Sequence, residues 1–174
     1  MTPAASPVRG FDRRILFAVI VVVMVIIDQI IKAWARHTFS VNLNAMQGAP
    51  FPGVFEFTLT YNQGVAFGMF QGHGVWLTPI AVLMSGGAAY YSIKNRNEPV
   101  ITHVALGLLA AGSLGNLYDR LVAQRVTDMF YFRLINFPVF NFADSCITVA
   151  AVLFIGSVIF DGGKKPVASP SRAE

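Results

Sequence analysis

The sequence predicts an all-α membrane protein in which four transmembrane helices carry a small extracytoplasmic β-sheet at the membrane interface. Of the 174 residues, 55% are hydrophobic and only 13% are charged, which is too apolar for a soluble domain of this size. Four apolar stretches of about 20 residues could each cross a hydrocarbon core of about 30 Å as a helix. These stretches are residues 15–34, 75–93, 100–118 and 141–160.

Basic residues orient the four predicted spans. Most of them fall in the two tails and in the loop between the second and third spans: Arg9, Arg13, Arg14, Lys94, Arg96, Lys164, Lys165 and Arg172. With four spans these regions share one side, and the positive-inside rule makes that side cytoplasmic. The net charge of +4 therefore reflects topology, and the clustered basic stripe of a nucleic-acid-binding protein is absent from the sequence.

The predicted organisation is a single four-helix membrane domain over residues 15–160. Residues 1–14 form a cytoplasmic tail before it, and residues 161–174, rich in Gly, Pro, Ser and Lys, form a disordered cytoplasmic tail after it. The outer loops are 35–74 and 119–140. The segment from Asn62 to Gly74 holds several glycines and is a candidate lid.

The first span resembles a secretory signal in its basic flank, but no small-residue cleavage site follows Ile27 and the helix continues through Trp34. We therefore expect an uncleaved first span. The single cysteine, Cys146, lies in the fourth span and excludes a disulfide within the chain. We expect it to be a small buried apolar residue.

Two segments of the outer loops have strand character. Residues 54–61 alternate apolar and polar side chains, and their apolar members are Phe55, Phe57, Leu59 and Tyr61. The second segment is 126–135, and the two are expected to pair, with the apolar face resting on the membrane surface or the helix bundle. Glycines within the second and third spans are expected to mark close helix packing: Gly86, Gly87, Gly107, Gly112 and Gly115.

Polar residues cluster in the outer half of the predicted membrane domain. They are Asp28, Lys32, Asn62, Asn116, Asp119, Arg120, Asp128, Asn141 and Asp144. Carboxylates are costly in or near hydrocarbon, so this clustering indicates a functional site. The alternative is a hydrogen-bonded network that only holds the helices together.

Spacing suggests local roles for some of these residues. Asp28 and Lys32 are four residues apart with the acid first, which favours a helical ion pair. Asn141 and Asp144 lie on the first turn of the fourth span, where Asn141 can cap the helix. Arg120 either keeps a nearby carboxylate ionised or anchors the helix at the interface.

Asp128 and Asp144 flank one short loop and form a candidate catalytic pair. Two neighbouring carboxylates share one proton, so the ionised member can activate water while the protonated member polarises a carbonyl. This is aspartic-protease chemistry, which needs no metal and no other cofactor. The sequence contains no H-E-x-x-H segment, no cysteine cluster and no G-x-S-x-G segment with a histidine base.

Five segments in order identify a family resemblance. They read Asp28-Gln29-Ile30-Ile31-Lys32, Asn62-Gln63-Gly64-Val65-Ala66-Phe67, Gly112-Ser113-Leu114-Gly115-Asn116-Leu117-Tyr118-Asp119-Arg120, Val126-Thr127-Asp128 and Phe140-Asn141-Phe142-Ala143-Asp144. Five such segments in this order, together with four predicted spans, resemble the lipoprotein signal peptidases (signal peptidase II). Members of that family are bacterial inner-membrane aspartic proteases. The sequence departs slightly at Ala111, where many members have glycine, and at Met129, where phenylalanine is usual.

The resemblance implies that Asp128 and Asp144 are the catalytic dyad. The position of the other candidates then suggests their roles. Residues expected to bind substrate or orient the dyad are Asn62, Gly64, Asn116, Arg120 and Asn141. Those expected to give structural support are Asp28, Lys32 and Asp119.

The resemblance also implies a substrate and a location. The substrate would be a prolipoprotein whose cysteine carries diacylglyceryl, cut just before that cysteine. The enzyme would lie in the bacterial inner membrane, in contact with lipid, with its site toward the outer face. A monomer is the default expectation, and the sequence does not indicate the oligomeric state. The alternatives are a small ion- or proton-coupled transporter and a non-catalytic assembly factor. The sequence does not indicate which aspartate is the base or which prolipoproteins are preferred.

Overall fold

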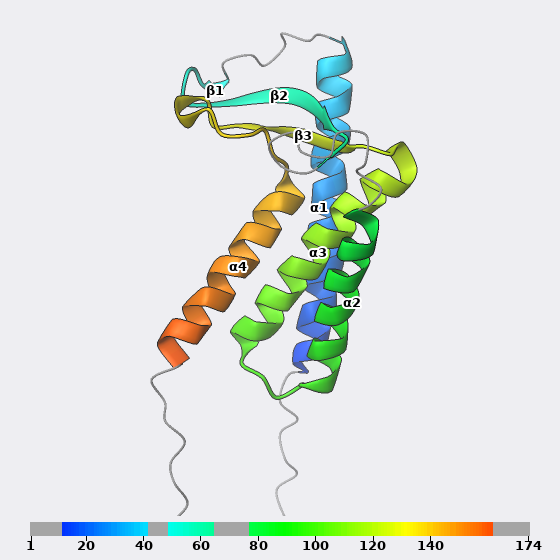
Figure 1. The fold of residues 1–174 in the computed structure, drawn as a ribbon, viewed down its shortest axis with the longest axis vertical. Coiled ribbons are helices and arrows are strands. Elements are labelled where there is room, and N and C mark those ends of the chain that lie inside the picture. Colours follow the sequence, from blue (N-terminus) through cyan, green and yellow to red (C-terminus); the bar gives the residue numbers. More distant parts are fainter. Residues whose placement is uncertain (1–11, 42–48, 65–76, 162–174) are drawn as a thin grey trace, which may run out of the picture.

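The computed structural model describes residues 12–41, 49–64 and 77–161. Its elements, in chain order, are α1 (Arg13–Val41), β1 (Pro50–Phe51), β2 (Phe55–Asn62), α2 (Thr78–Lys94), α3 (Val100–Ala123), β3 (Val126–Tyr131), the 3-10 turn η3 (Arg133–Ile135) and α4 (Phe142–Asp161). The sheet lies across one end of the helices (Figure 1). Most of both predicted tails and most of the candidate lid lie outside the described residues, although α1 begins at Arg13 and α4 ends at Asp161, each within a predicted tail.

Three of the described helices are long and apolar enough to cross a membrane: α1, α3 and α4. α2 has 17 residues and is shorter than these, so the fourth span remains a prediction. α1 continues to Val41, beyond the predicted end at Trp34. The extension forms because Ala35 and Phe39 are buried against Met129 beneath the sheet, a contact that hydropathy alone does not reveal.

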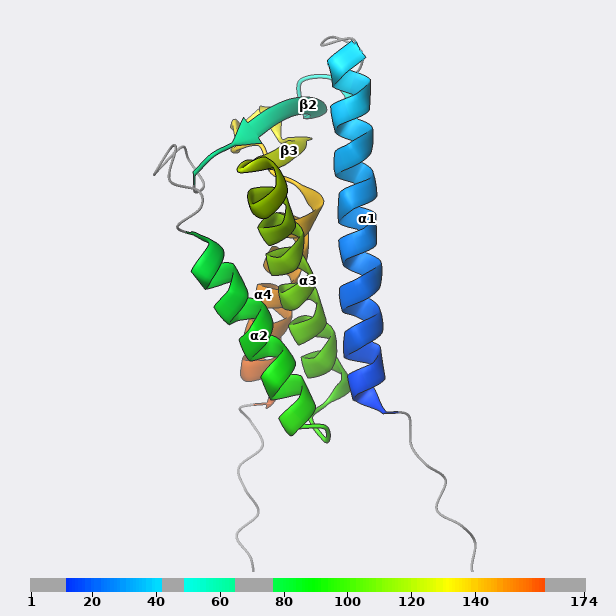
Figure 2. The ribbon, with the colours of Figure 1, turned by 90° about the vertical axis from the view of Figure 1, so that its right-hand side faces the viewer.

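α3 is the central helix, with α1 and α2 on opposite sides of it (Figure 2). α4 packs on α3 as well. Glycines allow these close approaches, as predicted: a Cβ on Gly107 would lie 2.9 Å from Ile20, and a Cβ on Gly112 would collide with the carbonyl oxygen of Ala143. The prediction is wrong for Gly86 and Gly87, which have nothing within 4 Å of an added Cβ.

α2 contacts α3 through another face, where its buried side chains are small and recur at helical spacing. They are Ala81, Ser85, Ala88 and Ser92. Gly86 and Gly87 lie on the opposite, exposed face. On the α3 side, Leu106 and Ala110 pack against Ala88. A pattern of glycines within one helix therefore did not identify the contact face.

The three strands form an antiparallel sheet in the order β1-β2-β3. The predicted pairing of the two strand segments is confirmed, with Thr60 opposite Asp128, whereas β1 was not predicted. The second segment is extended only to Tyr131 and then turns through η3. Phe57 and Leu59 rest on the α1 side, with the Trp34 and Phe57 rings 5.5 Å apart edge to face.

Candidate active site

Asp144 is held at the start of α4 by a reciprocal capping arrangement. The backbone N–H of Asp144 donates to Asn141 Oδ1 at 3.0 Å, and the backbone N–H of Asn141 donates to Asp144 Oδ2 at 3.2 Å. The predicted cap at Asn141 is confirmed. A carboxylate three residues into a helix also meets the positive end of the helix dipole. The place of Asp144 in the first turn of α4 and its contacts with Asn141 therefore follow from the local sequence.

Asp128 lies on β3 and is 2% exposed. Asn141 Nδ2 donates to its Oδ1 at 2.6 Å, and the Asn62 side chain also bonds to it. Burial raises the pKa of Asp128 to about 7, and the negative charge of Asp144 adds to this rise. Asn141 thus contacts both aspartates, which come from different elements.

Asn116, on α3, links this pair to α1. Its Nδ2 donates to Asp144 Oδ1 at 2.8 Å, while its Oδ1 accepts from Lys32 Nζ and from Asn141 Nδ2, both at 3.1 Å. Two donors on one side and a carboxylate on the other allow only one orientation of the amide. Asn116 therefore fixes Asp144 relative to α1 and α3.

A buried ion-pair group lies beneath the pair. Lys32 Nζ is 2.9 Å from Asp28 Oδ2 and 3.3 Å from Asp119 Oδ2, and none of these side chains is more than 3% exposed. The predicted pair of Asp28 and Lys32 is confirmed. Asp28 also accepts from the Ala143 N–H at 3.0 Å, and Asp119 accepts from the Thr127 N–H at 3.0 Å. The group therefore holds the backbone next to each candidate catalytic aspartate.

The remaining predicted residues line the same region. Gly64 N–H donates to Asn62 Oδ1 at 2.9 Å, which closes a turn at the end of β2. Arg120 Nη1 lies 3.5 Å from the carbonyl oxygen of Asn116, and its Nε is buried without a hydrogen-bond partner among the described residues. Within the described ranges Arg120 forms no ion pair, whereas Lys32 pairs with Asp119 and Asn116 binds Asp144.

Two residues of the network were not singled out in the sequence. Gln29 Nε2 donates to Asp28 at 3.0 Å and to Asp119 at 3.3 Å. Arg36 Nη1 donates to Thr127 Oγ1 at 2.9 Å, which ties β3 to α1. Arg36 follows Lys32 by four residues on the same helical face, so its spacing was the available signal.

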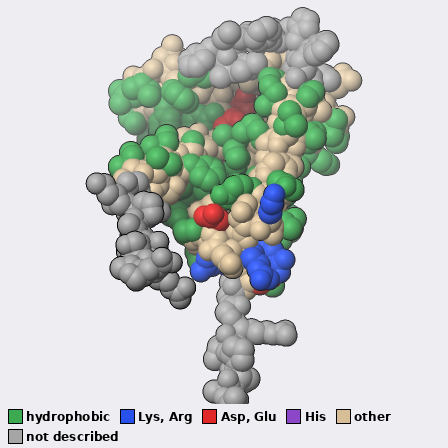
Figure 3. All heavy atoms as spheres, turned by 60° about the horizontal axis from the view of Figure 1, so that its bottom comes forward, with side chains coloured by type: hydrophobic (Ala, Val, Ile, Leu, Met, Phe, Trp, Pro, Cys, Tyr) green, Lys and Arg blue, Asp and Glu red, His purple; other side chains and the backbone are tan. Residues whose placement is uncertain are grey.

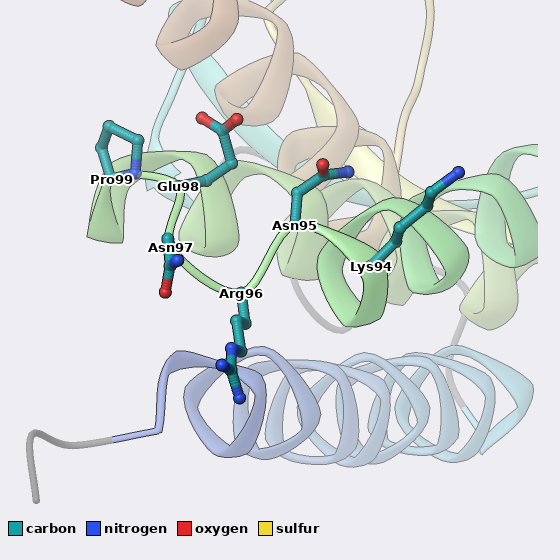
Figure 4. Close-up of a pocket in the computed structure, with 6 residues that line it drawn as sticks. All are labelled: Lys94, Asn95, Arg96, Asn97, Glu98 and Pro99. Atoms are coloured by element: carbon teal, nitrogen blue, oxygen red, sulfur yellow. The ribbon is translucent and has the colours of Figure 1, made fainter.

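The surface has two recesses of different character. Viewed from the end opposite the sheet, an acidic side chain lies in a recess between hydrophobic walls (Figure 3). A second hollow lies in the loop between α2 and α3 and is lined by Lys94, Asn95, Arg96, Asn97, Glu98 and Pro99. Its side chains point in different directions, so they do not converge on a ligand (Figure 4).

Comparison with known proteins identifies the family. The model of the family described as signal peptidase (SPase) II matches residues 20–160, from α1 through α4. The chain belongs to the signal peptidase II family. It is therefore a membrane-embedded peptidase, as the five sequence segments predicted, and the match includes every residue of the network above.

Individual relatives agree with the signal peptidase II assignment. The lipoprotein signal peptidase of Clostridium acetobutylicum is 31% identical over 150 residues, covering 84% of this chain and 95% of the relative. That of Gloeobacter violaceus is 34% identical over 154 residues, covering 88% and 87%. A solved structure described as a bacterial membrane enzyme matches with a TM-score of 0.77 and 28% identity, covering 88% of this chain and 93% of that one.

Proposed function

We propose that this signal peptidase II family member is an aspartic endopeptidase that removes the signal peptide from diacylglyceryl-modified prolipoproteins. It would cut just before the lipidated cysteine. The observation that carries the proposal is the contact of Asn141 with both Asp128 and Asp144, which makes one hydrogen-bonded unit of two carboxylates from separate elements. Members of this family named lipoprotein signal peptidases support the substrate class.

The proposed mechanism divides the work between the two aspartates. Close carboxylates share one proton, and burial favours keeping it on Asp128, whose pKa is raised to about 7. Asp144 then carries the charge, which Asn116 and the backbone N–H of Asn141 stabilise. Asp144 takes a proton from the attacking water while Asp128 donates its proton to the scissile carbonyl oxygen. Collapse of the tetrahedral intermediate passes the proton held by Asp144 to the leaving amine, and the carbonyl proton returns to Asp128.

Substrate binding would use groups that the network leaves available. Arg120 has a buried Nε without a partner in the described part of the chain, so its guanidinium can donate to a substrate carbonyl. Asn62 and Gly64 lie at the end of β2 beside Asp128 and can orient the extended peptide. The recess of Figure 3, with hydrophobic walls, suits a substrate that arrives through lipid.

The proposed topology has α2 as the fourth span, both termini in the cytoplasm and the dyad toward the outer face of a bacterial inner membrane. α2 runs beside α3 (Figure 2). Lys and Arg side chains gather at the end opposite the sheet (Figure 3). The four basic residues described there are Arg13, Arg14, Lys94 and Arg96. We propose a monomer.

The decisive test is cleavage of a diacylglyceryl-modified prolipoprotein by purified protein in detergent with EDTA. We expect Asp128→Asn and Asp144→Asn each to lower the cleavage rate by about 10²–10⁴-fold, because each removes a proton-transfer group. Asp12→Asn, on the exposed Asp12 side chain outside the site, is the matched control and should cleave at the wild-type rate.

Three outcomes would contradict the proposal. Folded wild-type protein could fail to cleave, either aspartate variant could retain full activity, or the unlipidated precursor could be cut equally well. The first outcome rejects the proposed cleavage, the second rejects the dyad, and the third rejects only the lipid requirement. Transport has no supporting observation in the described residues, since the buried ionisable groups of the spans collect beside the sheet, with His103 as the exception.

A further inference from the structure

One end of the sheet exposes a group of large apolar side chains. We call it the sheet tip, and it comprises Phe51, Val54, Phe132, Leu134, Ile135 and Phe137. Leu134 is 72% exposed, Ile135 is 69% exposed and Phe51 is 62% exposed. These residues lie outside the three helices that are long enough to cross a membrane. Contiguous exposed apolar groups of this kind mark an interaction surface.

The backbone of the sheet tip satisfies its own hydrogen bonds. Leu134 N–H donates to the Val54 carbonyl at 3.3 Å, and Asn136 N–H donates to the Arg133 carbonyl at 3.0 Å. Phe137 N–H donates to the Phe132 carbonyl at 3.1 Å. Internal pairing of these donors removes the main cost of moving an irregular turn out of water.

The charges of the sheet tip are also balanced. Arg133 Nη1 lies 2.7 Å from Glu56 Oε2, and the Glu56 side chain is 8% exposed. These are the only charged residues within 49–57 and 130–141. Glu56, one of the polar residues that alternate along its strand, is buried and binds Arg133 and the Gly53 N–H. The sheet tip therefore carries no net charge.

The position of the sheet tip indicates the partner. The end of the sheet that carries β1, together with the chain between β3 and α4, extends over α4 (Figure 1). α4 exposes its own column of apolar side chains, including Val149, Val152 and Ile155, and must face lipid along it. The apolar surface of the sheet tip continues that lipid-facing surface beyond the end of the helix.

We propose that the sheet tip inserts into the bilayer leaflet next to the sheet, at the boundary between headgroups and acyl chains. The partner is the lipid surface, and binding is driven by the burial of Leu134, Ile135 and Phe51 in the apolar phase. Attraction to anionic headgroups contributes little, because Glu56 neutralises Arg133. Insertion sets the depth of the sheet, and therefore of β3 and Asp128, relative to the membrane. The proposal goes beyond the peptidase activity and does not depend on it.

The experiment measures depth with nitroxide labels on single cysteines, in a Cys146→Ala background, after reconstitution into phosphatidylcholine vesicles. Labels at Leu134→Cys and Ile135→Cys are compared with Val152→Cys on α4, as the lipid reference, and Asn97→Cys in the α2–α3 loop, as the water reference. We expect both sheet-tip labels to collide with oxygen more than with a water-soluble nickel chelate, as the Val152→Cys label does. The ratio should stay the same when salt is raised.

A second measurement asks whether these side chains cause the insertion. A label at Phe51→Cys should become accessible to the nickel chelate when Leu134→Ser and Ile135→Ser are combined. The matched pair Val158→Ser and Ile159→Ser, at the other end of α4, should leave the Phe51→Cys label unchanged.

Several results would overturn the proposal. Nickel access at Leu134→Cys equal to that of Asn97→Cys would mean that the sheet tip stays in water. Loss of access to both reagents would mean that protein covers it, and spin–spin broadening that disappears on dilution with unlabelled protein would identify a second copy as the cover. An unchanged Phe51→Cys label in the serine pair would also contradict it.

Discussion

The two halves of α3 bury their side chains in different ways. In the half beside the sheet, Asn116 and Asp119 bind partners from α1, α4 and β3. In the other half, Leu106 and Ala110 pack on the small residues of α2. The exception is His103, whose Nδ1 lies 2.9 Å from Ser92 Oγ in a buried pair.

The difference shows how one small bundle can hold carboxylates at membrane depth. Beside the sheet, each carboxylate has partners from at least one other element, so the site is assembled only when all the elements meet. In the other half, close packing of apolar and small side chains supplies helix association without polar groups. The proposed catalysis would therefore depend on the polar half, while helix packing in the apolar half would offset part of the free-energy cost of burying its carboxylates.

The largest expected effect on stability comes from removing the central cation of the polar half. Lys32→Met leaves Asp28 and Asp119 buried without their positive partner, and we expect a loss of about 3–5 kcal/mol in the free energy of unfolding. Thermal unfolding in detergent measures it. Lys94→Met, on an exposed residue at the other end, is the control, and equal effects of the two variants would remove the distinction between the halves.

A smaller effect is expected at the contact between α3 and α4. Gly112→Ala places a methyl group against the Ala143 carbonyl, next to the first turn of α4, and should cost about 1–3 kcal/mol and lower activity. Gly86→Ala faces open space and should be neutral or slightly stabilising, since alanine favours helix. Unfolding and cleavage measured on both variants test this, and a harmless Gly112→Ala would show that α4 can shift without disturbing Asp144.

The protonation of Asp128 in the polar half should make both stability and activity depend on pH. The pKa of Asp128 rises from 3.8 to about 7 in the folded protein, so the folded state binds this proton more tightly than the unfolded state. The stabilising contribution of the proton is present below pH 3.8 and is lost as the pH rises through 7. Because the proposed general acid needs the proton, kcat/KM should fall about tenfold per pH unit above that value.

Two profiles check this expectation. Cleavage is followed from pH 5 to pH 9, on the order of two units either side of the Asp128 pKa. Unfolding of Asp128→Asn is followed over the same range, and it should lack the part of the pH dependence that Asp128 supplies. A flat activity profile through pH 8 would contradict the assignment of Asp128 as the acid.

The smallest effect is expected in the apolar half. Ser92→Ala removes one hydrogen bond from the buried His103 and should cost about 1 kcal/mol, with no change in cleavage rate. Unfolding and cleavage assays on the same preparation separate the two effects. A loss of activity at wild-type stability would mean that the two halves are coupled.

Local spacing was sufficient to predict several features. The ion pair of Asp28 and Lys32 needs only one helical turn, and the cap at Asn141 needs only the residues that follow it. The pairing of β2 with β3 followed from alternation in one segment and β-like character in the other. Each of these predictions depends on neighbours in sequence, for which helix and strand geometry is regular.

Features that depend on distant residues were missed or wrong. α1 is longer than its apolar stretch because Phe39 packs beneath the sheet, and Glu56 is buried because it meets Arg133. Gly86 and Gly87 face outward, since α2 turns Ala81 and Ala88 toward α3. The burial of Glu56 depends on a residue far away in the sequence, whereas the contact face of α2 did leave a signal, because its small residues recur at helical spacing.

By itself, the sequence determined the membrane character, the strand segments and the residue types of the site, because hydropathy and helical spacing are local properties. Only the tertiary structure decided that Asn141 bridges Asp128 and Asp144, that Asn116 orients one of them, and that Arg120 forms no ion pair within the described residues. These outcomes depend on which donors and acceptors the fold brings within hydrogen-bonding distance. That choice is made only when helices and strands distant in sequence pack together and exclude water.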